Sequence, residues 1–281
     1  DQAITINPDY AEAYSNRGTM LQELKRFNEA LTSYAQAIKI NPDYVYAHWN
    51  ASMCNLRNGN FKAGWSGYEM RWKHFQCNSK PLKSANPVWD FKKTNQRLLV
   101  WAEMGIGDHI FFGSLLSELL EDVPNLLVQI DKRLIPIFTR SLPKIKFYPD
   151  NFILPESDYD IHVPIGSLGK YLRNNEKDFS LGKNKFFISD ETRTQAIRQE
   201  LSASKKLICG VSWKSGAGAT GVNRSISLEK LAAIFDPAKI SLVNLQYGDA
   251  SKDIGLLETN IELIQYKSID TFSDLDGVAS L

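Results

Sequence analysis

A glycine turn after an apolar run is the first place where this sequence could do chemistry. Leu98–Trp101 is typical of a buried strand, Gly105 and Gly107 form a turn, and apolar residues recur at helical spacing after Asp108. Ligands of open parallel sheets bind at the carboxyl ends of the strands, where this turn is expected. A carboxylate there could accept a proton from an acceptor hydroxyl, so Asp108 is a candidate general base. A simpler interpretation, compatible with the first, is that Asp108 is the N-cap of the next helix.

A second candidate site surrounds a glycine-rich loop further along the chain. Cations and small residues flank this loop on both sides: Lys214, Ser215 and Gly216 before it, Arg224 and Ser225 after it. Lysine supplies a point charge and arginine a bidentate fork, and a nearby helix start adds its dipole. The pattern suits the diphosphate of a nucleotide. The alternative is a solvated surface loop.

Two common phosphate-binding motifs are excluded at these turns. Ile110 stands where a dinucleotide fingerprint needs its third glycine. The glycines of the second loop have P-loop spacing, but Val222 and Asn223 replace the Lys-Ser/Thr pair that a P-loop requires.

Two short acidic motifs resemble those with which some sugar transferases hold a metal: Asp158-Tyr159-Asp160 and Asp274-Leu275-Asp276. Two carboxylates one residue apart are common by chance, and no histidine has a Cys or His neighbour at ligand spacing. We therefore expect neither a metal nor another cofactor.

A repeat of 34 residues precedes these sites, because Ile6–Tyr10 recurs as Ile40–Tyr44. The period and the small residues between the two copies resemble the tetratricopeptide repeat, a helix-turn-helix unit. The resemblance is clear for residues 9–42 and looser for 43–73. It predicts antiparallel helix pairs with Ala30 and Ala37 at close contacts. Four aromatic residues end the region and predict a helix that caps the repeat stack: Trp65, Tyr68, Trp72 and Phe75.

The remainder alternates short apolar runs with helical patterns, which predicts doubly wound parallel sheets. Expected strands are 98–101, 126–130, 145–148, 159–163, 207–213 and 240–245. Expected helices are 134–141, 189–202 and 228–235. Residues 76–96, with two prolines and several lysines, read as a linker.

The bulk composition excludes several classes of protein. Lys and Arg number 33 against 32 Asp and Glu, a net charge of +1, so nothing favours a nucleic-acid partner. The apolar runs are too short to span a bilayer. Cys54, Cys77 and Cys209 are odd in number and widely spaced, which indicates a reducing compartment and a cytoplasmic protein.

Asp1 and Leu281 both fall inside helical patterns, so we expect a chain cut at both ends.

Five blocks in order carry a resemblance to bacterial glycosyltransferases that are joined to tetratricopeptide repeats and related to the heptosyltransferases. The blocks are Trp101–Asp108, Asp131–Leu134, Gly210–Gly216, Arg224–Leu228 and Leu245–Gly248. The resemblance implies a two-lobed GT-B fold with a nucleotide-sugar in its cleft. It implies that Asp108 is the acceptor-side base and that Lys214 and Arg224 face the donor phosphates. By the same resemblance the donor site includes Ser215, Gly216, Ser225 and Gln246, and the second lobe is incomplete.

These observations predict four segments. Residues 1–75 are repeats, 76–96 a linker, 97–190 an acceptor-side lobe and 191–281 part of a donor-side lobe. The leading hypothesis is transfer of a sugar from a nucleotide-sugar to a protein or peptide that the repeats present. One alternative is a protein-binding repeat module with an inert α/β lobe, and another is a different α/β enzyme that uses Asp108 or the acidic pairs.

Overall fold

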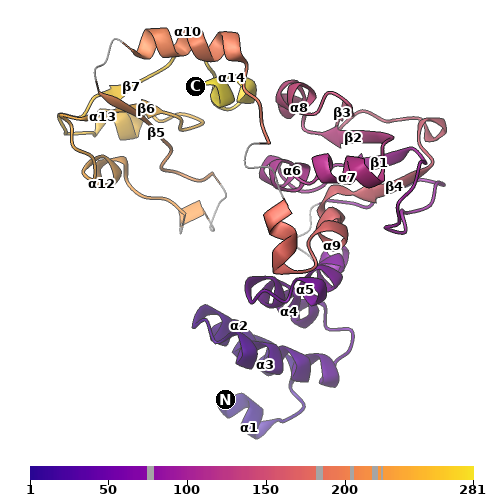
Figure 1. The fold of residues 1–281 in the computed structure, drawn as a ribbon. Coiled ribbons are helices and arrows are strands. Elements are labelled where there is room, and N and C mark those ends of the chain that lie inside the picture. Colours follow the sequence, from indigo (N-terminus) through magenta and orange to yellow (C-terminus); the bar gives the residue numbers. More distant parts are fainter. Residues whose placement is uncertain (75–78, 182–185, 203–205, 217–220, 223) are drawn as a thin grey trace. The chain divides into compact units, whose positions relative to one another are not determined.

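The computed structural model describes residues 1–74, 79–181, 186–202, 206–216, 221–222 and 224–281 (Figure 1). Phe75, Gly218 and Asn223 therefore lie outside the described residues. The chain forms two compact units. The first comprises Asp1–Ile135 with Leu142–Phe186, and the second Pro136–Ser141 with Phe187–Leu281.

The first unit begins with the helices of the repeats. They are α1 (Gln2–Ile6), α2 (Ala11–Glu23), α3 (Phe27–Ile40), α4 (Val45–Arg57), α5 (Phe61–Tyr68) and the 3₁₀ helix η1 (Glu69–Lys73). Ala30 and Ala37 are completely buried, as expected for close helix contacts. A Cβ on Gly18 would lie 2.5 Å from the Tyr34 ring, so this glycine lets α2 approach α3. Helical repeats are therefore confirmed over the predicted region.

A parallel sheet of four strands forms the rest of the first unit, in the order β3-β2-β1-β4. Its strands are β1 (Leu98–Trp101), β2 (Leu126–Ile130), β3 (Lys146–Pro149) and β4 (Ile161–Pro164). The helices of this part are α6 (Ile106–Gly113), α7 (Leu116–Asp122), η2 (Lys132–Leu134), η3 (Glu156–Asp158), η4 (Ile165–Ser167), α9 (Leu168–Leu172) and η5 (Glu176–Leu181). Helix α8 (Ile135–Ser141) follows η2 in the chain and, except for Ile135, belongs to the second unit. Every residue of β1, β2 and β4 is buried, which agrees with their mainly apolar sequences; Gln129 and His162 are the buried polar exceptions.

The order of these strands places a topological switch point between β1 and β4. The chain leaves β1 toward β2 on one side, and β4 pairs with β1 on the other. In open α/β sheets this is where ligands bind, beyond the carboxyl ends of the strands. A ligand site is therefore expected at the residues that follow β1 and β4.

The segment predicted as a linker packs along the first sheet. Val88 forms a parallel bridge with His162 of β4, and the Trp89 N–H donates to the His162 carbonyl at 2.8 Å. The Trp89 side chain is buried, and its indole Nε1 donates to the Lys92 carbonyl at 2.9 Å. This segment is thus tied to the sheet by backbone and side-chain contacts.

The second unit has a parallel sheet of three strands, in the order β5-β6-β7. The strands are β5 (Leu207–Val211), β6 (Ile240–Asn244) and β7 (Leu263–Ile264), and the helices are α10 (Glu191–Leu201), α12 (Leu228–Ala232), α13 (Ser251–Gly255) and α14 (Leu275–Ser280). Trp213, Leu228 and Leu242 lie in its core. The predicted class, helical repeats followed by parallel α/β structure, is confirmed. No helix in the described ranges is long and apolar enough to cross a membrane.

Candidate functional site

The glycine turn after β1 has the predicted position but a different start for the helix. Gly105 is the N-cap of α6, with extended backbone, and the helix begins at Ile106. Asp108 is the third helical residue, and its Oδ2 accepts the Gly105 N–H at 3.1 Å. The prediction that Asp108 is itself the N-cap is wrong. The carboxylate caps from inside the first turn, where it also faces the positive end of the helix dipole.

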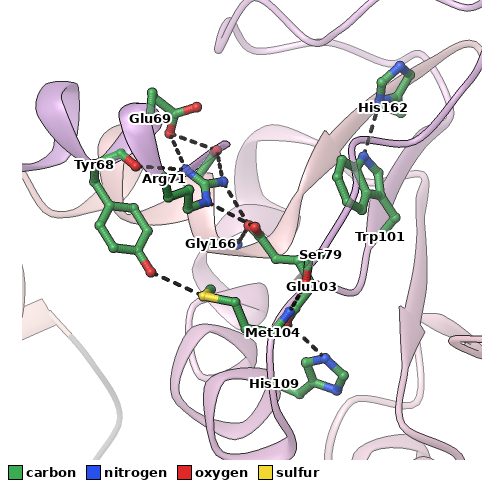
Figure 2. Close-up of polar contacts among 11 residues, drawn as sticks. Tyr68, Glu69, Arg71, Ser79, Trp101, Glu103, Met104, His109, His162 and Gly166 are labelled. Atoms are coloured by element: carbon green, nitrogen blue, oxygen red, sulfur yellow. Dashed lines mark hydrogen bonds and ion pairs between the residues drawn. The ribbon is translucent and has the colours of Figure 1, made fainter. Parts of the chain in front are cut away.

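The residue before this turn has an unusual backbone. Met104 has φ = 64°, in the left-handed region that costs a non-glycine residue about 1–2 kcal/mol. Two contacts hold it there: its N–H donates to Ser79 Oγ at 2.7 Å, and its sulfur accepts the Tyr68 hydroxyl at 3.4 Å (Figure 2). The repeats and the segment 79–96 therefore both fix the start of the turn.

A buried ion pair joins the repeats to the same turn. Arg71 of η1 donates from Nε to Glu103 Oε2 at 2.9 Å and from Nη2 to Glu103 Oε1 at 2.7 Å (Figure 2). The side chains are 2% and 0% exposed. The remaining groups are also bonded, because Arg71 donates to Glu69 and Ser167, and Glu103 accepts the Gly166 N–H at 2.8 Å. A buried pair of charges is tolerated only when it is satisfied in this way.

This ion pair occupies the switch point. Glu103 lies just beyond β1, while Gly166 and Ser167 lie just beyond β4. A Cβ on Gly166 would lie 2.5 Å from the Glu103 carboxylate, so the two strand ends are in close contact. The end of the repeat region is thus anchored where an open α/β sheet usually holds a ligand.

The aromatic residues at the end of the repeats strengthen this anchor. The Trp65 ring lies against Gly169, where a Cβ would be 2.8 Å from it, and the Trp72 and Trp101 rings are 5.6 Å apart. The same cluster also packs on the last repeat helix, because the Tyr68 ring lies 5.4 Å from that of Trp49 in α4, so the prediction of a capping helix stays open. The aromatic area of the cluster is buried against the first α/β sheet, which supplies the apolar surface that the repeats need.

His109 ties the ends of β1 and β2 together and is buried. Its Nδ1 accepts the Asp131 N–H at 3.1 Å, so Nε2 carries the proton and donates to the Glu103 carbonyl at 3.1 Å. Burial lowers the pKa of His109 and keeps the ring neutral. The residue has a positioning role in this structure.

A pH dependence follows from this histidine. A histidine whose pKa is lowered by folding gives its full stabilisation above the pKa of the unfolded chain, about 6.5, and loses it as the pH falls toward the folded value. We expect the free energy of unfolding to decrease between about pH 7.5 and about pH 5.5. His109→Gln should make this decrease smaller, measured by urea unfolding at both pH values.

The comparison of wild type and variant is needed because other groups titrate. Burial also lowers the pKa of His74 and His162, so these residues, like His109, reduce the free energy of unfolding as the pH falls. Burial raises the pKa of Glu103, so this residue increases the free energy of unfolding as the pH falls. An equal pH slope in wild type and His109→Gln would show that His109 is not held neutral.

In the second unit, Gln246 organises the loop that follows β5. Its side-chain Oε1 accepts the N–H groups of Trp213 and Lys214 at 2.9 and 2.8 Å, and the Ser212 hydroxyl at 3.1 Å. Its Nε2 donates to the carbonyls of Lys214 and Tyr247. The buried amide is thus fully engaged, which favours a positioning role over the predicted contact with a donor.

The two predicted flanks of the glycine loop lie side by side. The Ser225 hydroxyl accepts the Ser215 N–H at 3.0 Å and donates to the Gly221 carbonyl at 2.7 Å. The Gly216 N–H donates to the Tyr247 hydroxyl at 2.6 Å. The structure therefore gathers the predicted residues of this loop at the carboxyl ends of β5 and β6.

The two cations of this loop have different partners. Lys214 Nζ donates to Oδ1 of Asp253 at 2.6 Å, and the Trp213 indole N–H donates to Oδ2 of the same carboxylate at 3.0 Å. These hydrogen bonds, led by that from Lys214, lower the pKa of Asp253. Arg224 is exposed and forms no ion pair with any residue that the structure describes. One cation is thus fixed, and the other faces solvent.

The acidic motifs bind arginines. Arg97 donates to Asp160 and lowers the pKa of that carboxyl to about 2. Asp274 accepts from Arg193, and Asp276 accepts from Arg140. Across the described ranges, no group of His, Cys, Asp and Glu side chains could hold a metal ion.

Sequence reasoning missed Arg71 and Glu103. Glu103 stands inside the Trp101–Asp108 block, but neither its type nor its spacing distinguishes it there as a site residue. Arg71 is 32 positions from Glu103, and such a separation carries no periodic signal. Arg71 stands between Tyr68 and Trp72 of the predicted aromatic cluster, and this position is the sign that could have pointed to the pair.

Comparison with known proteins supports the assignment of the repeats. The tetratricopeptide family model matches residues 11–44. These residues form a tetratricopeptide repeat. Protein FlbA of Caulobacter vibrioides is 25% identical over an alignment that covers 100% of this chain and 51% of FlbA. The chain thus spans about half the length of this relative.

Two solved glycosyltransferases are similar in structure at low scores. One is a family 9 glycosyl transferase from Veillonella parvula, with 14% identity, a TM-score of 0.43, and coverage of 68% of this chain and 74% of that one. The other is a mutant O-GlcNAc transferase from Thermobaculum terrenum, with 10% identity, a TM-score of 0.25, and coverage of 94% and 69%. Scores this low carry no argument about the activity of this chain.

Proposed function

We propose that this chain is part of a glycosyltransferase that takes its sugar from a nucleotide-sugar and whose repeats present a protein or peptide acceptor. The observation that carries the proposal is the loop after β5. It combines Lys214, an exposed Arg224 and a run of backbone N–H groups at the carboxyl end of a parallel sheet. The five sequence blocks that resemble tetratricopeptide-linked glycosyltransferases support the same assignment.

The donor side would meet the charge of the leaving diphosphate. Without a metal, the negative charge that builds on this group needs fixed cations or N–H donors. An ammonium has three N–H donors, so Lys214 retains capacity for a phosphate while it binds Asp253. Arg224 would add a bidentate contact. Ser215, Gly216 and Ser225 would contribute at the same edge, with Gln246 holding the loop in position.

The acceptor side would use Asp108 as general base. Its Oδ2 binds Gly105, while its Oδ1 makes no hydrogen bond within the described ranges. One oxygen is therefore held by the turn, and the other is available to take a proton from an acceptor hydroxyl. The cytoplasmic location inferred from cysteine usage belongs to the same proposal.

The second candidate function is a protein-binding repeat module with an inert α/β part. The Arg71–Glu103 pair favours this second function, because the end of the repeats fills the switch point of the first sheet, where a ligand would otherwise bind. If this second function is correct, the loop after β5 binds no nucleotide.

Nucleotide binding separates the two functions. We expect the full-length protein to bind one of the common nucleoside diphosphates, and Lys214→Ala/Arg224→Ala to weaken binding at least about tenfold, because each charged hydrogen bond contributes about 1.5–3 kcal/mol. Isothermal titration calorimetry gives both affinities. The matched control is Arg198→Ala/Lys239→Ala, which removes the same charges from exposed positions. Equal affinity in wild type and loop variant would remove the phosphate role.

A further inference from the structure

Four successive backbone N–H groups after β5 donate to side-chain oxygens. Those of Trp213 and Lys214 donate to Gln246, that of Ser215 to Ser225, and that of Gly216 to the Tyr247 hydroxyl at 2.6 Å. Runs of backbone N–H groups of this kind form anion sites in many proteins. Here each donor already has an oxygen partner from the same chain.

The last of these partners is the one that a ligand could replace. Gln246 is only 7% exposed, whereas Tyr247 is 41% exposed and Gly216 is exposed as well. A Cβ at position 216 would lie 3.0 Å from the Tyr247 hydroxyl, so the absence of a side chain there permits the contact. The exposed ring lies 6.5 Å from that of Phe272, also on the surface.

We propose that the Tyr247 hydroxyl occupies the Gly216 N–H in the free protein and gives it up to a phosphate oxygen of the donor. The inference rests on the proposed function. A phosphate oxygen is a stronger acceptor than a phenol, because hydrogen bonds to a charged group are roughly twice as strong as neutral ones. The exchange is therefore favourable, but the hydrogen bond between the Gly216 N–H and the Tyr247 hydroxyl must break before the phosphate can bind.

Tyr247 thus sets the affinity of the site without contacting the phosphate. The variant Tyr247→Phe keeps the ring and its position beside Phe272 but removes the competing oxygen. A neutral hydrogen bond contributes about 0.5–1.5 kcal/mol net, so the variant should bind a diphosphate roughly fivefold more tightly. A residue that contacted the ligand through its hydroxyl would give the opposite result.

The test is calorimetric titration of full-length wild type and Tyr247→Phe with UDP, GDP, ADP, CDP, dTDP and pyrophosphate. Pyrophosphate has no base, so the same gain with this ligand would assign the exchange to the phosphate. The control is Tyr266→Phe, which removes a hydroxyl from the same unit and should leave the affinity unchanged.

Tighter binding by Tyr247→Phe supports the inference. Equal or weaker binding by the variant, when the wild type binds, overturns it and leaves the proposed function standing. If neither protein binds any of these ligands, the proposed function fails and the inference fails with it. Circular dichroism of each variant verifies that the exposed substitution has not altered the fold.

Discussion

Arg71→Ala should lower the free energy of unfolding by about 3–5 kcal/mol, because it leaves the Glu103 carboxylate buried without a counter-charge. The carboxylate would keep the Gly166 N–H but lose both bonds from the guanidinium. Urea unfolding followed by tryptophan fluorescence measures the change, since Trp72 and Trp101 lie 5.6 Å apart beside this pair.

Two further variants define the origin of this effect. Arg26→Ala breaks an exposed pair with Glu29 in the same unit and should change the free energy of unfolding far less than Arg71→Ala, because solvent screens exposed charges. Arg71→Met/Glu103→Leu removes both charges and should recover much of the lost stability, because replacing a buried pair with apolar side chains is often neutral. If the single variant is as stable as wild type, the pair does not anchor the repeats.

Asp108→Asn should reduce sugar transfer by about a hundredfold or more, the usual scale for a lost general base. The substitution isolates the chemistry, because an asparagine oxygen can still accept the Gly105 N–H while the amide cannot take a proton. The free energy of unfolding should therefore change little. Turnover of the full-length protein with a fixed donor and acceptor measures the effect.

Asp108→Ala provides the comparison, since it removes the cap as well. It should lose both transfer and about 0.5–2 kcal/mol of stability, the range for a lost helix cap. Unchanged turnover in Asp108→Asn, at equal stability, would leave Asp108 with its capping role alone.

The sequence predicts the buried strands closely and the helix starts less well. Leu126–Ile130 is predicted to the residue, because a strand buried on both faces is mostly apolar, with Gln129 as the exception here, and Asp131 follows its last residue. The helix after β1 is predicted too late, since Ile106 and Gly107 read as turn residues but already belong to α6. Glycine at the N-cap does not reveal which neighbour adopts helical geometry first.

The sequence likewise predicts some residues of the candidate site but not the contacts between them. Local spacing identifies Lys214, Ser215 and Gly216, and Ser225 is found because it flanks the same loop. Local spacing does not reveal that Tyr247 binds Gly216 or that Arg71 binds Glu103, because these contacts join residues that are 31 and 32 positions apart in the sequence. Contacts of this kind depend on strand order and helix docking, which leave no periodic pattern in a single sequence.

The most direct test of the central claim is nucleoside diphosphate release from a panel of nucleotide-sugars by the full-length protein. We expect saturable release from one donor, and loss of that release in Lys214→Ala/Arg224→Ala. Absence of release with every donor, from a folded protein whose repeats still bind a protein partner, would contradict the glycosyltransferase function and favour the binding module.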